Sequence, residues 1–287
     1  MTLRTILVPA DGTEDSNRCM DMGFRMGRRL EGHVDALHVR ADPKDTVPLL
    51  GEGMSVAMIE DMMDIAEKEG TTRSAQARQA FNSAIEKYGA TLADAPTGSG
   101  FSARWVEEVG REDDGVAAHG RLADLIVAAR PTEESDVSTN LTLNAAIFET
   151  GRPVLVVPPG EVAEPGRKIV ISWNGSAQSA RAVASAMPLL RAAESVTAFT
   201  VDSGRTSGER APELASYLQW HGITANTQTI SGPSSTVGPK LIEDLGAEGA
   251  DLLVMGAYTH SRMRQLILGG VTRYVLEQAS VPVFMAH

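Results

Sequence analysis

Residues 168–176 read KIVISWNGS, and residues 5–13 read TILVPADGT. Both stretches are short apolar runs that end in Asn-Gly or Asp-Gly followed by a hydroxyl residue. A further serine lies three residues beyond that hydroxyl residue, at Ser179 and Ser16 respectively. An apolar run closed by such a dipeptide predicts a buried strand that ends in a turn. The chain therefore contains the same strand-and-turn pattern twice.

The repetition extends beyond these two stretches. In each half a helical pattern follows, then a second apolar strand, a strand that begins with Ala-Asp, and a closing strand that contains Pro-Val. The matched segments are 17–30 with 180–191, 33–39 with 196–201, 123–129 with 250–256, and 152–157 with 281–285. Five matches in one order indicate a duplicated domain, because repeats of this length mark repeated structural units.

The apolar runs predict the fold class. They are apolar at consecutive positions, which is typical of parallel strands covered by helices on both faces. We therefore predict an α/β protein with two tandem open parallel five-stranded sheets. The expected domains are residues 1–159 and 166–287, joined at the Pro/Gly/Glu-rich segment 158–166. A run of Pro and Gly residues without apolar periodicity is typical of a linker.

The first half contains extra residues, which predict two helices at 51–69 and 72–88. Met54, Met58 and Met62 recur at a spacing of four and so share one helical face. A methionine face of this kind is expected in the core or as a cover over a pocket, and less often as a functional surface.

Composition excludes several classes of protein. The net charge is −11, and residues 168–287 contain nine acidic and nine basic residues, so the whole acidic surplus lies in residues 1–167. Binding to nucleic acid is not expected, because affinity for a phosphate backbone depends on Lys and Arg. No apolar run approaches the roughly 18 residues of a membrane span, so no membrane association is expected. The first residues enter a strand pattern directly, so we expect no signal peptide and a cytoplasmic location.

The sequence offers few sites for catalysis or metals. Cys19 is the single cysteine and lies in an apolar helical pattern, so a buried, inert thiol is expected. Phosphate-binding and catalytic motifs of the forms GxxxxGK[ST], GxGxxG, GxSxG and HExxH are missing from the sequence. The six histidines do not have the spacing of metal ligands, so no metal site is predicted.

The segment 256–272 is the best candidate for binding a ligand. It begins with Gly256, has Gly269 and Gly270 near its end, and includes hydroxyls at Ser261 and Thr272 and several cationic side chains. Glycines let backbone N–H groups approach an anion, and the following helix adds partial positive charge at its N-terminus. His260, Arg262 and Arg264 would supply further donors. The alternative is a solvated loop with a Gly-Gly contact to a helix.

These patterns resemble the universal stress protein family over nearly the whole chain, twice. The shared features are the first strand with its Asx-Gly turn, the long loop after the fourth strand, and the closing Val-Pro-Val strand. The resemblance implies an ATP-type nucleotide site in residues 166–287, with Mg²⁺ only if ATP binds. The implied binding residues are Trp173, Asn174, Gly175, Thr200, Val201, Gly256, Ala257, His260, Ser261, Arg262, Gly269, Gly270, Val271 and Thr272.

Two positions depart from the family pattern. Thr259 replaces a glycine, and a β-branched residue at positive φ would cost on the order of 1–2 kcal/mol. Asn174 replaces an aspartate that in the family reaches the adenine and ribose. Because Asn still donates and accepts hydrogen bonds, weaker binding rather than no binding is expected.

The corresponding loop of the first half, residues 129–140, contains no glycine, three acidic residues and Pro131. Like charge would repel a triphosphate, so we predict that this half binds no nucleotide. Asp11 would then cap the turn after its strand.

Two functions remain open from the sequence. The first is a cytoplasmic stress-response protein with one regulatory nucleotide site and no enzymatic activity beyond, at most, very slow ATP hydrolysis. The alternative is a nucleotide-free dimerisation or interaction module, in which strands 153–157 and 281–285 pair within the chain and a homodimer forms. A third interpretation, an adenylating ligase or flavoprotein subunit, lacks the motifs SGGxDS and HIGH.

Overall fold

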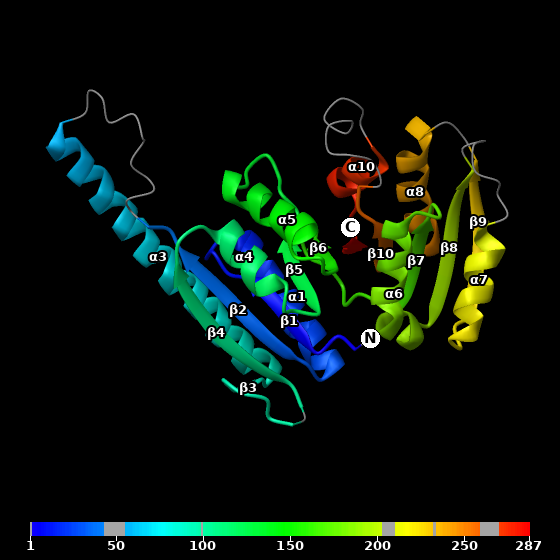
Figure 1. Ribbon diagram of the computed structural model, residues 1–287, viewed down its shortest axis with the longest axis horizontal. Helices are drawn as coiled ribbons and strands as arrows, with labels where there is room; N and C mark the ends of the chain where they lie inside the picture. Colours follow the sequence, from blue (N-terminus) through cyan, green and yellow to red (C-terminus); the bar gives the residue numbers. More distant parts are fainter. Residues whose placement is uncertain (1, 43–54, 99, 203–209, 232–233, 259–269) are drawn as a thin grey trace. The chain divides into compact units, whose positions relative to one another are not determined.

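The computed structural model describes residues 2–42, 55–98, 100–202, 210–231, 234–258 and 270–287. Within these ranges the chain divides into two compact units. Residues 4–150 form the N-terminal unit, and residues 151–287 together with residues 1–3 form the C-terminal unit. Both units alternate strands and helices (Figure 1). The predicted α/β class is therefore confirmed.

The described part of the N-terminal unit is a parallel sheet in the order β3-β4-β2-β1-β5. Its first strand, β1, pairs with β2 on one side and β5 on the other, so the chain changes direction across the sheet between β1 and β5. The elements are β1 (Thr5–Pro9), α1 (Glu14–Leu30), β2 (His33–Arg40), α3 (Val56–Tyr88), β3 (Thr91–Leu92), β4 (Ser102–Val109), α4 (Glu112–Gly120), β5 (Leu125–Ala129) and α5 (Val137–Glu149).

The C-terminal unit repeats this arrangement with the order β6-β11-β10-β7-β8-β9. Strand β7 lies between β8 and β10, and all pairs are parallel except β6 with β11. The elements are β6 (Val154–Val157), β7 (Lys168–Trp173), α6 (Ala177–Ala192), β8 (Ser195–Asp202), α7 (Arg210–Trp220), β9 (Ala225–Ser231), α8 (Ser234–Glu248), β10 (Leu252–Gly256), α10 (Val271–Gln278) and β11 (Val283–Ala286).

The antiparallel pair β6–β11 joins the two closing strands of the repeat. Val156 pairs with Val283, and Val154 pairs with Met285. The predicted pairing of segments 153–157 and 281–285 is therefore confirmed. Strand β6 consequently contributes to the C-terminal unit, although it precedes the Pro/Gly-rich segment.

The apolar runs form the cores. Ile6, Leu7 and Val8 of β1 are buried, as are the corresponding central residues of β7. Strands buried on both faces need helices on both sides, which explains why the apolar positions are consecutive. Cys19 is buried in α1, and burial raises the pKa of its thiol, as expected of an inert cysteine.

The turn after the first strand has the same hydrogen bonds in both units. Asp11 Oδ1 accepts from Thr13 N at 2.8 Å, and Asn174 Oδ1 accepts from Ser176 N at 3.1 Å. The hydroxyl residue then caps the following helix, since Thr13 and Ser176 each accept from the backbone N–H three residues on. The predicted capping role of Asp11 is confirmed.

Helix α3 differs from the prediction. Two helices were expected, but residues 56–88 form one helix of 33 residues, and residues 51–54, including Met54, lie outside the described residues. Thr71 and Thr72 continue the helix by donating their hydroxyls to the carbonyls of Glu67 and Lys68. Helices tolerate such residues when the hydroxyl bonds to the preceding turn.

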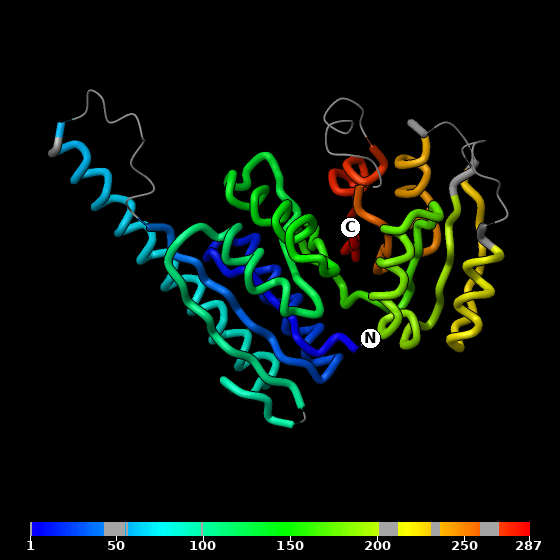
Figure 2. The backbone as a smooth tube through the Cα atoms, viewed as in Figure 1, coloured from blue at the N-terminus to red at the C-terminus, as the bar shows by residue number. Residues whose placement is uncertain are grey.

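The first turns of α3 run past the end of the strands of their own unit (Figure 2). Met58 is 53% exposed and Ile65 is 64% exposed, so the expectation that the methionine face lies in the core is wrong for Met58. Among the described residues, no helix has both the length and the apolar character to cross a membrane.

Candidate functional site

The sheet topology gives each unit one place where ligands are expected. In open parallel sheets they bind beyond the carboxyl ends of the strands, where the strand order reverses. In the C-terminal unit this place lies between the ends of β7 and β10. Three segments meet at this edge: the turn after β7, the end of β8, and the start of the loop after β10.

Gly256 ends β10 in close contact with the first turn of α6. A Cβ atom at this position would lie 2.6 Å from the backbone nitrogen of Ser179 and 2.9 Å from Gln178. Real Cβ atoms do not approach a backbone that closely, so only glycine fits here. The glycine thereby lets the strand end reach the N-terminus of α6.

The chain beyond Gly256 returns to the same edge at α10. Tyr258 has φ of 50° and donates its N–H to Thr272 Oγ1 at 3.3 Å. Gly270 is the N-cap of α10 and makes no side-chain capping hydrogen bond, and a Cβ placed on it would have open space around it. Within the described residues no side chain caps the first amides of α10, and uncapped amides at a helix N-terminus can bind an anion.

The structure places ten of the fourteen predicted binding residues around this edge. Trp173, Asn174 and Gly175 lie at the end of β7. The others lie at the end of β8, the end of β10 and the start of α10: Thr200, Val201, Gly256, Ala257, Gly270, Val271 and Thr272. Thr200 is buried and its hydroxyl lies 3.4 Å from the carbonyl of Gln228. His260, Ser261, Arg262 and Gly269 lie outside the described residues, as do Thr259 and Arg264. The assignment of all fourteen residues to a nucleotide site stays a prediction.

Comparison with known proteins points to one family. Residues 219–287, which run from the end of α7 to the C-terminus, match the model of the universal stress protein family. The universal stress protein Slr1230 of Synechocystis is 22% identical over 295 residues, covering 98% of this chain and 99% of that protein.

Residues 219–287 therefore resemble the universal stress protein family. The family resemblance drawn from the sequence is thereby confirmed. A solved universal stress protein from Archaeoglobus fulgidus has the same fold along 99% of this chain and 96% of its own, with a TM-score of 0.71 and 15% identity. A solved universal stress protein in complex with cAMP matches 56% of this chain and 100% of its own, with a TM-score of 0.32 and 16% identity.

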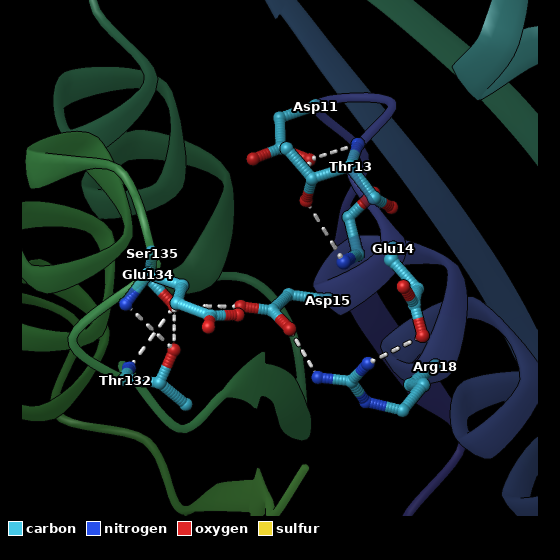
Figure 3. Close-up of polar contacts among 9 residues, drawn as sticks. Asp11, Thr13, Glu14, Asp15, Arg18, Thr132, Glu134 and Ser135 are labelled. Atoms are coloured by element: carbon cyan, nitrogen blue, oxygen red, sulfur yellow. Dashed lines mark hydrogen bonds and ion pairs between the residues drawn. The ribbon is translucent and has the colours of Figure 1, made fainter. Parts of the chain in front are cut away.

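At the equivalent edge of the N-terminal unit, side chains join the turn after β5 to α1 (Figure 3). In the turn after β5, Thr132 N donates to Ser135 Oγ at 3.0 Å, and Ser135 Oγ donates to Asp15 Oδ2 at 2.7 Å. Asp15 lies in the first turn of α1 and also pairs with Arg18. The Asp15 carboxylate therefore lies at the N-terminus of α1 and is joined to the turn after β5. That the N-terminal unit binds no nucleotide stays a prediction.

The N-terminal unit nevertheless contains a cavity of about 940 Å³ beyond the ends of β1, β2 and β4, which the sequence did not reveal. Glu112 lines it, and burial, followed by the nearby Asp11 carboxylate, raises the pKa of Glu112 to about 7. Thr142 donates its hydroxyl to Glu112 at 2.8 Å. A clue in the sequence was the charged run that follows β4, residues 111–114.

A buried histidine also lines this cavity. His38 Nδ1 lies 2.6 Å from the carbonyl of Ala10, and its ring stacks on Trp105 at 5.7 Å. Its Nε2 has no hydrogen-bond partner within the described residues. Because a backbone carbonyl only accepts, Nδ1 is the protonated nitrogen, and Nε2 is an unused acceptor.

Proposed function

We propose that the C-terminal unit binds an adenine nucleotide of the ATP type at the edge formed by β7, β8, β10 and α10, and that occupancy regulates a cytoplasmic stress-response protein. The observation that carries the proposal is the combination of Gly256, which admits the close approach to α6, with the open N-terminus of α10 at Gly270. Mg²⁺ would accompany only a bound ATP. The adenine and ribose would lie near Asn174 and the end of β8.

The described residues fit such a ligand. Backbone amides at a helix N-terminus hold phosphate oxygens without cationic side chains, which suits a unit with balanced charge. Asn174 uses Oδ1 to close its turn, so its amide N–H₂ remains available as a donor.

The same geometry favours a regulatory role over catalysis. Phosphoryl transfer needs a carboxylate that holds the metal and a residue that positions the attacking group. Asp251 lies at the opposite end of β10, where it accepts from the backbone N–H groups of Gly166, Arg167 and Lys168. Its role is therefore structural, and we propose that the bound nucleotide acts as a signal.

Isothermal titration calorimetry of the full chain with ATP tests the proposal. In Gly270→Val, the new side chain would occupy the space in front of α10, and we expect at least about a tenfold loss of affinity, or 1.4 kcal/mol. Gly246→Val, on the exposed side of α8 with open space around it, is the matched control and should bind normally. No binding heat for the unmodified chain, or equal affinity for both variants, would refute the site.

The pairing of β6 with β11 supports a second candidate, a nucleotide-free interaction module. In this candidate, β6 and β11 pair within one chain. Other surfaces of the chain would then form a homodimer. The molar mass from light scattering, measured with and without ATP, separates the candidates. A dimer that ATP does not alter, together with no nucleotide binding, would favour the module, whereas a monomer would contradict it.

A further inference from the structure

Four polar residues form a hydrogen-bonded cluster near the amino ends of β2 and β4, at the edge of the N-terminal sheet opposite to the 940 Å³ cavity. The strand register pairs His33 with Ser102 and Asp35 with Arg104. His33 Nδ1 lies 2.8 Å from Ser102 Oγ, and His33 Nε2 lies 3.2 Å from Asp35 Oδ1.

Arg104 fixes the carboxylate of the cluster. Its Nε donates to Asp35 Oδ1 at 2.8 Å, and its Nη2 donates to Asp35 Oδ2 at 3.1 Å. Hydrogen bonds from His33 and Arg104 outweigh partial burial and lower the pKa of Asp35. Asp35 is therefore ionised near neutral pH, and a bidentate arginine holds it in one orientation.

The ionised carboxylate determines which nitrogen of His33 carries the proton. A carboxylate only accepts hydrogen bonds, so the contact at Nε2 requires an N–H there. In the neutral ring Nδ1 is then an acceptor and receives the hydroxyl proton of Ser102. This is the arrangement in which a histidine acts as general base for a serine nucleophile and a carboxylate orients the base.

The cluster lines a cavity of about 550 Å³, and Ser102, His33 and Asp35 all contribute to its wall. Ser102 is only 5% exposed, so a reactant would reach its hydroxyl from the cavity rather than from bulk water. Gly98 and Gly100, both at positive φ, also line this cavity. Among the described residues, neither backbone N–H has a hydrogen-bond partner, which leaves donors for a developing oxyanion.

We propose that Ser102 is a nucleophile and that this cavity hydrolyses small, short-chain acyl esters. Ser102 Oγ bonds to the ester carbonyl carbon while its proton moves to His33 Nδ1. The bond to the leaving alkoxide breaks as His33 returns that proton to it, and the alcohol departs. Water then attacks the acyl-serine, gives one proton to His33, and releases the carboxylic acid as Ser102 recovers its proton. The sum is ester plus water to acid plus alcohol.

Each residue of the cluster has a distinct role in this reaction. Ser102 and His33 handle the reacting atoms, so they are the catalytic residues. Asp35 and Arg104 are positioning residues, since they act by holding the ring of His33 in one tautomer and orientation. The cavity of about 550 Å³ has room for a small acyl ester.

The test uses the full chain with p-nitrophenyl acetate and, separately, a fluorophosphonate probe located by peptide mass spectrometry. We expect labelling at Ser102 and ester hydrolysis above the buffer rate. Ser102→Ala should abolish the labelling, and Ser102→Ala and His33→Gln should each lower the rate by about 100-fold, as loss of a nucleophile or general base does. Asp35→Asn should lower it as well, because an amide no longer enforces the tautomer.

Ser74→Ala is the matched control and should keep the full rate. Ser74 lies on α3, away from this cavity, and donates its hydroxyl to Glu107 of β4. Ser102→Cys guards against a variant that fails to fold. Its thiol should react with iodoacetamide at least about tenfold faster than in the double variant that also contains His33→Gln. Labelling at other residues only, a wild-type rate for Ser102→Ala, or equal thiol reactivity in the two cysteine variants would overturn the proposal.

Discussion

The two copies of the repeat share the turn after their first strand but differ in the loop that faces it. Asp11 and Asn174 make the same hydrogen bond to the residue two positions on, and both turns lead into a capped helix. After the fourth repeat strand, however, the C-terminal unit has Gly256, whereas the N-terminal unit has Ala129.

The difference shows how the two copies of a duplicated site can come to differ. In the C-terminal unit Gly256 brings the end of β10 to the N-terminus of α6, and Gly270, the N-cap of α10, makes no side-chain capping hydrogen bond. In the N-terminal unit Ser135 and Asp15 join the loop to α1. The local structure that positions the loops is therefore retained in both copies, and only the chemistry offered to a ligand has changed.

The largest effect is expected from placing a side chain at Gly256. Gly256→Val forces a Cβ against the backbone of Ser179, and overpacking of this kind costs about 3 kcal/mol of unfolding free energy. Urea denaturation, followed by the fluorescence of Trp173 in the same unit, measures the loss. The reciprocal change Ala129→Gly should cost less than about 1 kcal/mol. Equal effects at the two positions would show that the copies do not differ in this contact.

A second prediction concerns the pH dependence that Glu112 gives to the N-terminal unit. Its pKa is about 7 in the folded chain against 4.5 for an ordinary glutamate, so the folded state binds the proton more tightly. The contribution of Glu112 to the free energy of unfolding is therefore complete below pH 4.5 and is lost as the pH rises through about 7. At about 1.4 kcal/mol per pKa unit, and allowing for partial exposure, the loss is roughly 2 kcal/mol.

Glu112→Gln should remove this dependence, because an amide does not titrate. Urea denaturation between pH 5 and 8 would show a flatter stability curve for the variant than for the unmodified chain, and Trp105 reports on this unit. A stability that rises over this range in the unmodified chain, or an identical slope in both proteins, would contradict the assignment.

The smallest effect is expected at the turn of the C-terminal unit. Asn174→Asp restores the carboxylate that the N-terminal copy has at Asp11. A charged acceptor for a ribose hydroxyl strengthens a hydrogen bond, so ATP affinity should rise by about fivefold, or about 1 kcal/mol. Calorimetry on the full chain measures the change. Unaltered or weaker affinity would place the ribose away from Asn174.

The sequence was most informative where local rules govern the structure. The Asx-Gly turn, the capping hydroxyl and the continuous apolar strands follow from short patterns, and the structure contains all three. It also paired the closing strands correctly, because the repeat made β6 and β11 equivalent.

What the sequence did not reveal depends on contacts between distant residues. Two helices were expected at 51–69 and 72–88, yet α3 runs through residues 70–71, where the hydroxyls of Thr71 and Thr72 bond to the preceding turn. The cluster of His33 and Ser102 requires the register of two strands 69 positions apart, which no local pattern encodes. The raised pKa of Glu112 likewise arises from burial and from a carboxylate that lies on another strand loop.

The strand exchange at β6 has a practical consequence for dividing the protein. A fragment that begins at Gly166 keeps β7 to β11 but discards the strand that covers the edge of β11. The row of amides and carbonyls on β11 would then be free to pair with another molecule, as exposed edge strands do. The two copies of the repeat and the two compact units therefore do not end at the same residue, and a cut between Thr150 and Gly151 keeps β6 with β11.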